Sequence, residues 1–167
     1  QILKFGESEY LSIVSAFTSQ PFDMPYQLSK MGIDFAEIKP FELFCLLIAG
    51  VPQSNSQLLF GDLDFSKFVP VVKENDLVLI NQDGIIIDSI LRERIADNLR
   101  RMHGMSKNII TSCENKFTHD LLISQQKKDI ERAQRRAEMF GESSVYGSLI
   151  SSLACKWHSY DAVLDFK

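Results

Sequence analysis

The spacing of apolar residues in the first eighteen positions predicts a helix. In ESEYLSIVSAFT, residues 7–18, apolar side chains recur at intervals of three and four residues, which places them on one face. These side chains are Tyr10, Leu11, Val14 and Phe17. Pro21 interrupts the pattern.

A second short helix is predicted over MPYQLSKM, residues 24–31. Asp23 is expected to cap its beginning, Pro25 lies in its first turn, and Gly32 is expected to end it. The brief segment IDFAEI, residues 33–38, is expected to be extended.

Pro40 then opens a third helix, PFELFCLLIAG, which Gly50 is expected to end. Because this segment is apolar on nearly all sides, we expect it to be the most buried helix. A further helical turn is predicted in SNSQLLFG.

The period of the pattern changes in the middle of the chain. Three short runs rich in β-branched residues are separated by KEND and QDG, namely FVPVV, LVLIN and GIIID. They predict a three-stranded antiparallel meander from about Phe68 to Asp88, with Asp83-Gly84 as the second tight turn. Pro70 should place the first strand at an edge of the sheet.

A helical period returns in ILRERIADNLRRMHG. Ser89 is expected to cap this helix, with Glu93 near the capping-box position, and Gly104 to end it. Its predicted apolar stripe is Ile90, Leu91, Ile95, Leu99 and Met102.

The next segment, to about Asn115, is polar and aperiodic and is predicted to be a loop or hinge. Thr118 is expected to cap a long helix that runs to about Phe140, whose apolar residues thin out after Ile123. A stripe this thin buries little on its own chain, so this helix is expected to project or to dock on a partner. VYGSLISSLACKW and HSYDAVLDFK predict two more helices.

These elements predict an α+β protein that is mainly helical, with a small three-stranded antiparallel β-meander and a C-terminal helical extension. Residues 1–104 are expected to form a compact body. Residues 105–167 are expected to form a helical extension, hinged around Ser106 to Asn115.

Charge is distributed unevenly along the chain, whose net charge is -4. Residues 92–136 hold 11 Lys and Arg against 6 Asp and Glu, whereas the other residues hold 7 against 16. This asymmetry predicts a basic surface on an acidic body. The stretch KKDIERAQRRAE contains the candidate phosphate-contacting residues Lys127, Lys128, Arg132, Arg135 and Arg136. The alternative is a solvated or partner-facing helix, because no aromatic residues interleave for base stacking.

No residue pattern indicates catalysis, a metal or a cofactor. The three histidines lack ligand spacing, and Asp62 and Asp64 lack the remainder of a calcium loop, so we expect these Asp residues to cap a turn. Neither a nucleophile elbow nor a phosphate-binding loop occurs. Cys155 and His158 lie three residues apart, a spacing that permits a catalytic pair, and Cys45 is expected to be an inert core thiol.

Cysteine number and hydropathy bear on the compartment. Three widely spaced cysteines fit a reducing compartment rather than a disulfide framework. The longest apolar run is shorter than the roughly 20 residues that span a bilayer, so no membrane association is expected. The chain begins with Gln1 and no signal peptide, and we expect a processed or partial form of a longer protein.

Aromatic and Met residues in the first half suggest a protein-docking groove, although a compact helical core explains the same residues. The candidate partner-binding residues are Phe22, Met24, Tyr26, Phe41, Phe44 and Ile130.

Several stretches together resemble proteins of tailed phages and prophages of low-GC Gram-positive hosts. They are AFTSQPFDMPYQLSKMGIDFAEIKPFELF, LLFGDLDFSKF, IADNLRRMHGM and SLISSLACKWHSYDAVLDFK. The last is similar to the ends of tail assembly chaperones, with Tyr160, Val163 and Asp165 matching a Y-x-x-V-x-D turn. The β-meander and the long charged helix depart from the usual all-helical chaperone.

The resemblance implies a non-enzymatic phage assembly protein made in the host cytoplasm, either a tail assembly chaperone or a structural tail or neck component incorporated in the virion. Its implied partners are the tape-measure or tail-tube protein, with a homo-oligomer as a further alternative. A nucleic-acid-binding phage protein that uses residues 92–136 is the second hypothesis, and an enzyme is the third.

Overall fold

The computed structural model describes residues 7–52, 56, 59–110, 112–113 and 115–140. Its elements, in chain order, are α1 (Glu7–Thr18), η2 (Pro21–Asp23), α2 (Pro25–Lys30), α3 (Pro40–Ile48), η3 (Phe65–Lys67), β1 (Val69–Lys73), β2 (Asp76–Ile80), β3 (Ile86–Ile87), α5 (Ser89–His103) and α6 (Lys116–Phe140). The predicted α+β class, mainly helical with a three-stranded antiparallel sheet, is confirmed. The two helices predicted after Gly141 lie outside the described residues.

Contacts divide the chain into two units, Gln1–Gln126 and Lys127–Lys167. Residues 105–126, which the sequence assigned to the extension, therefore belong to the first unit. The hinge expected around Ser106 to Asn115 stays a prediction.

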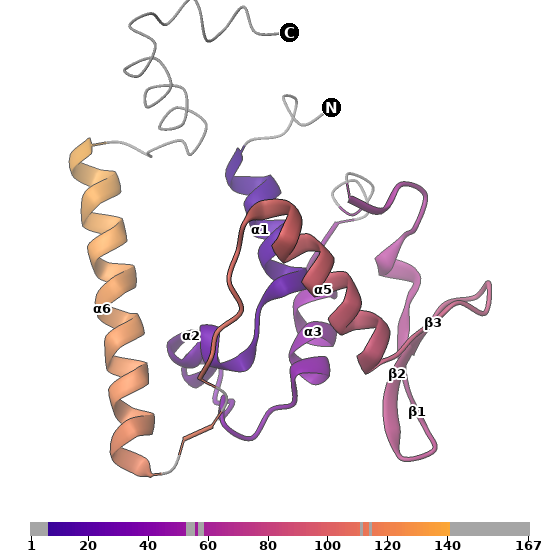
Figure 1. Cartoon of the computed structure of the whole chain (residues 1–167), viewed down its shortest axis with the longest axis horizontal. Helices are drawn as coiled ribbons and strands as arrows, with labels where there is room; N and C mark the ends of the chain where they lie inside the picture. The colour runs from indigo at the N-terminus through magenta and orange to yellow at the C-terminus, as the bar shows by residue number, and fades with distance from the viewer. Residues whose placement is uncertain (1–6, 53–55, 57–58, 111, 114, 141–167) are drawn as a thin grey trace, which may run out of the picture. The chain divides into compact units, whose positions relative to one another are not determined.

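The main core of the first unit lies between α1, α3, α5 and the sheet (Figure 1). Phe17, which is fully buried, is at its centre. The Phe17 ring centroid lies 5.6 Å from that of Phe44, 4.6 Å from that of Phe60 and 4.8 Å from that of Phe65. Apolar residues of α1 and α3 thus combine with Phe60 and Phe65 in an aromatic core.

A second, smaller core joins α2 to the beginning of α6. Its buried residues are Leu28, Phe35 and Leu43, and Leu122 and Ile123 of α6 pack against them. The His119 ring stacks on Phe35 at a centroid distance of 4.5 Å. The first half of α6 is therefore held by packing within the first unit.

The sheet has the order β1-β2-β3, so β1 is an edge strand and Pro70 lies where it was expected. Glu74 and Asn75 connect β1 to β2 with positive φ angles of 52° and 72°, as a two-residue hairpin turn requires. The second connection, residues 81–85, is longer than the predicted Asp83-Gly84 turn, and within it the Ile85 amide donates to the Asn81 side chain at 2.8 Å.

Four local predictions were wrong. Thr118 does not cap α6, because α6 begins at Lys116 and the Asn115 side chain accepts the Thr118 amide at 2.9 Å. Asp23 does not cap α2, because its carboxylate accepts the Gln20 amide at 2.7 Å within η2, and α2 begins after Met24. Within residues 33–38 the chain forms a turn over residues 35–37 instead of an extended segment, and the Ile38 amide donates to the Asp34 carbonyl at 3.1 Å. The cap of α5 is Asp88 and not Ser89, since the Asp88 side chain accepts the Leu91 amide at 2.7 Å. An aspartate carboxylate competes well with a serine hydroxyl for this position.

The buried face of α5 also differs from the predicted apolar stripe. Ile90 and Met102 are exposed, whereas Arg92 and Arg100 are buried. Arg92 donates to the Ser19 carbonyl at 2.6 Å, and Arg100 donates to the Thr18 carbonyl. Carbonyls at a helix C-terminus lack intrahelical partners, so the two arginines satisfy the end of α1.

Glu93 is the counter-charge that both buried arginines share, and Asp97 lies 2.9 Å from Arg100 Nη1 as a second one. The Glu93 carboxylate lies 2.8 Å from Arg92 Nη1 and 3.5 Å from Arg100 Nη1, and it pairs with Lys107. Burial acts to raise the pKa of Glu93, but the hydrogen bond from Lys107 and the neighbouring positive charges outweigh burial and lower the pKa.

A lowered pKa makes ionised Glu93 stabilising above its ordinary pKa of 4.5, and this stabilisation is lost as the pH falls through the lower folded value. We expect Glu93→Gln to lower the free energy of unfolding at neutral pH. We also expect the variant to lose less stability than the wild type on acidification. Urea unfolding followed by circular dichroism over a pH series measures both effects, and parallel pH profiles would contradict the assigned role.

Candidate protein-binding surface

An apolar groove of about 760 Å³ lies between α3, η3 and the sheet. Leu46 contributes from α3, Phe68 from the end of η3, and Pro70 and Leu77 from the two longer strands. Glu42 and Ser66 are the polar side chains in the lining. The volume falls within the range of roughly 300–1,000 Å³ that is typical of binding pockets.

The sequence of α3 explains why one wall of the groove is apolar. Phe41, Phe44 and Ile48 point into the core, and because the helix is apolar on nearly all sides its other face is apolar too. Leu46 on that face is 48% exposed. A helix predicted to be the most buried thus leaves apolar surface open.

The polar groups of the groove are already engaged within the chain. Glu42 accepts the Lys39 amide at 2.9 Å, which satisfies the N-terminus of α3. Burial raises the pKa of the Cys45 thiol to about 11, so it stays protonated and weakly nucleophilic at neutral pH. The groove is therefore suited to apolar contact.

The predicted partner-binding residues occupy different environments. Phe41 and Phe44 are buried in the main core, where they stabilise the fold and offer no surface. Phe22 and Met24 are half-buried against the second core, and Tyr26 is half-buried with Lys30 over its ring. Ile130, in the second unit, is half-buried.

The predicted phosphate-contacting residues are all exposed on α6, namely Lys127, Lys128, Arg132, Arg135 and Arg136. Three of them have acidic neighbours on the helix. Lys127 and Arg135 each lie 4.0 Å from the Glu131 carboxylate, and Arg132 lies 3.4 Å from that of Asp129. Exposed pairs of this kind contribute little to stability.

Burial of Arg92 and Arg100 removes two cations from the basic region that the sequence indicated. Lys107 is paired with Glu93. The basic character of residues 92–136 is thus weaker on the surface than in the sequence.

The predicted turn-capping role is confirmed for Asp64, whose side chain accepts the Ser66 amide at 3.0 Å. In the described part of the chain, no group of three or more His, Cys, Asp or Glu is placed to hold a metal ion. No helix in that part is long and apolar enough to cross a membrane.

Leu46, Pro70 and Leu77 line the groove but were not among the predicted partner-binding residues. Leu46 carried a signal, because a nine-residue helix that is apolar all round cannot be covered on every side by a small domain. Comparison with protein-family models, curated proteins and solved structures found no match.

Proposed function

We propose that this protein is a non-enzymatic phage tail or virion assembly protein, similar to a tail assembly chaperone, that acts through protein–protein contacts in the host cytoplasm. The apolar groove between α3 and the sheet is the observation that carries the proposal. The resemblance of the sequence to tailed-phage proteins supplies the biological setting.

The groove fits an apolar helical segment of a tape-measure or tail-tube protein. A helix that docks in a groove inserts side chains spaced by three and four residues, and its backbone needs no partner because its own hydrogen bonds are complete. The groove lining offers Leu46, Leu77 and Pro70 as apolar contacts and has few free polar groups. Shielding such segments from water is the task that a tail assembly chaperone performs.

Replacement of Leu46 by glutamate tests the groove. We expect the variant to lose the partner, because a carboxylate would be desolvated against an apolar helix. Leu46 is 48% exposed, so the fold should tolerate the change within about 0.5 kcal/mol. The measurement is affinity capture from phage-producing cells, with and without nuclease, followed by mass spectrometry.

The matched control is Leu121→Glu, since Leu121 is 50% exposed on another helix. We expect the wild type and this control to recover the same tape-measure or tail-tube protein regardless of nuclease. Equal recovery by Leu46→Glu would remove the groove from the proposal. Failure of the wild type to recover any tail protein would reject the assembly function.

Nucleic-acid binding is the second candidate, favoured by the basic residues of α6. Lys128, Arg132 and Arg136 follow one another at intervals of four residues and so share a helix face. If this face contacts phosphates, affinity should fall steeply with salt because counterions are released.

We expect the triple change Arg132→Glu, Arg135→Glu and Arg136→Glu to abolish any nucleic-acid binding and to leave tail-protein capture intact. Fluorescence anisotropy of labelled DNA and RNA at several salt concentrations provides the measurement. Binding that survives the triple change would exclude α6 as the phosphate-contacting element.

A further inference from the structure

The outward face of the sheet is aliphatic on all three strands. Val69 pairs with Ile80, Val71 pairs with Val78, and Ile80 also pairs with Ile86. Because directly opposed residues lie on the same face of a sheet, these five side chains form one surface, which we call the outer face. The groove lies on the other face, which contains Pro70, Leu77 and Leu79.

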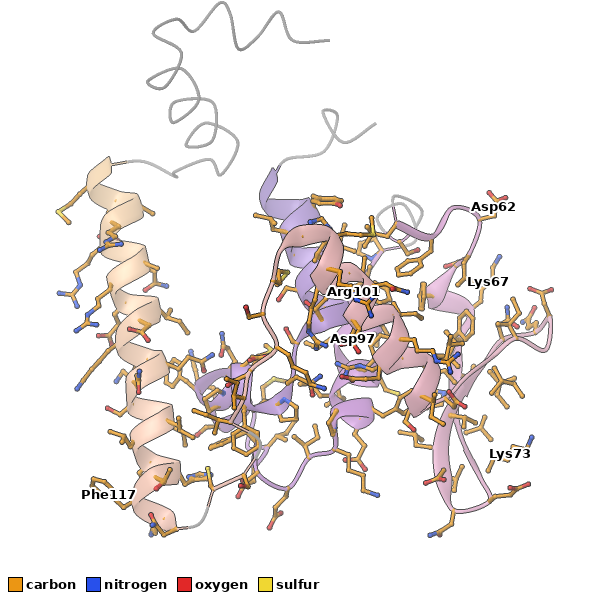
Figure 2. The ribbon with its side chains drawn as sticks, viewed as in Figure 1. Asp62, Lys67, Lys73, Asp97, Arg101 and Phe117 are labelled. Carbon is orange, nitrogen blue, oxygen red and sulfur yellow. The ribbon has the colours of Figure 1, made fainter. Side chains whose placement is uncertain are left out.

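The outer face is exposed on β1 and β3. Val69 is 60% exposed, Val71 41% and Ile86 42%, whereas Val78 is buried and Ile80 is half-buried. Lys73, on the same face, points away from α3 and α5 (Figure 2). A sheet with one solvated face normally alternates apolar and polar residues, so an aliphatic outer face indicates that another surface covers it.

The free edge of β1 is poorly suited to strand pairing. In a two-residue hairpin the flanking pair Lys73–Asp76 is hydrogen-bonded, so by alternation Pro70 and Val72 direct their backbone groups outward. Proline has no N–H. Of the two residues that point outward, only Val72 therefore has an N–H that could donate to another strand. Face-to-face packing is therefore favoured over an extended sheet.

Charges at the turn end specify an alignment. Lys73 and Asp76 lie opposite each other on the outer face, one on each strand. Two copies can pack face to face around a two-fold axis that runs parallel to the strands, between the two sheets and level with the gap between β1 and β2. This rotation would place Lys73 of each copy over Asp76 of the other copy. The same rotation places Val71 over Val78 and Val69 over Ile80, so a single operation satisfies both charge and shape.

We infer that a second copy of this chain covers the outer face. The two sheets pack face to face with their strands aligned within about 30°, as in other aligned sheet packings. This contact is distinct from the groove proposed for a tail protein, and both surfaces are available at once.

Sedimentation velocity of the full chain over a concentration series tests the dimer. We expect the wild type to be dimeric, and Val71→Lys to raise the dissociation constant about thirtyfold or more, because it buries a charge at the centre of the contact. Val72→Lys is the matched control, since Val72 is the next residue along β1, is 70% exposed and lies on the opposite face. The control should remain dimeric.

A mixing experiment tests the alignment. Lys73→Asp makes the turn end of each copy negative, and Asp76→Lys makes it positive, so each variant alone should weaken its own dimer about tenfold. An equimolar mixture should form heterodimers with wild-type affinity, because each negative end then faces a positive one. If the charges repel only within their own chain, the mixture should associate as weakly as each variant alone, and this result would contradict the alignment.

A wild-type chain that sediments as a monomer at every concentration would overturn the inference and would leave the outer face to a heterologous partner or another segment of the chain. A dimer that Val71→Lys leaves intact would also overturn it. Neither result changes the outcome of the Leu46→Glu capture experiment, so the two proposals can fail separately.

Discussion

Replacement of Arg92 by methionine is expected to destabilise the protein by about 3–5 kcal/mol, as does removal of one partner from a buried ionic network. Arg92 is only 2% exposed, and its guanidinium donates to the Ser19 carbonyl at 2.6 Å. Methionine fills similar space but cannot donate, so the end of α1 would keep a buried carbonyl without its partner. Urea unfolding at neutral pH measures the change.

The control for this experiment is Arg94→Met on the same helix. Arg94 is exposed, and its replacement should change the free energy of unfolding by no more than about 0.5 kcal/mol. Similar values for the two variants would show that Arg92 does not hold α1 to α5. A changed m-value would indicate instead that the variant alters the unfolded state.

The burial of Arg92 is a feature that could not be predicted from the sequence. The helical period of α5 and its end at Gly104 were predicted correctly, with Gly104 in the left-handed conformation at φ 62°. The buried face of α5 was not predicted correctly. A pattern of apolar residues cannot show that Arg92 is buried, because the carbonyl to which it donates lies 73 residues earlier in the chain. Arg92 is needed there because the carbonyls at the end of α1 require a hydrogen-bond donor, and only the tertiary structure places the end of α1 beside α5.

The sheet shows the opposite case. Its strands, its order and the edge position of Pro70 followed from local signals, since β-branched runs and short turns determine an antiparallel meander. The runs VPVV, LVLI and GIII are apolar at both odd and even positions, which is typical of a sheet with two apolar faces. An apolar outer face could therefore have been predicted from the order of residues along the strands.

The groove could not be predicted in the same way. Its lining combines α3 with residues of the turn after α2 and with two strands, so it depends on how these elements pack. Phe41 and Phe44 were predicted as partner-binding residues instead, because aromatic residues are common both in cores and in docking surfaces. Burial separates the two roles, and it becomes known only when the chain is folded.

Replacement of Phe17 by alanine is expected to cost about 3–5 kcal/mol, the range for truncating a buried aromatic side chain. Phe17 has no exposed surface, and its ring meets those of Phe44, Phe60 and Phe65 with centroid distances below 6 Å. Alanine would leave a cavity that three rigid rings cannot readily fill. For a chain of this length, the loss corresponds to a fall in Tm of about 10 °C.

Phe117→Ala is the matched control, because the same truncation is made at a side chain that is 77% exposed on α6 (Figure 2). Thermal unfolding followed by circular dichroism should show a large fall in Tm for Phe17→Ala and almost none for Phe117→Ala. Comparable small shifts for both would mean that the aromatic cluster is not the main source of stability. In that case the arginine network at the end of α1, rather than the contacts of Phe17, would have to hold α1 to the rest of the first unit.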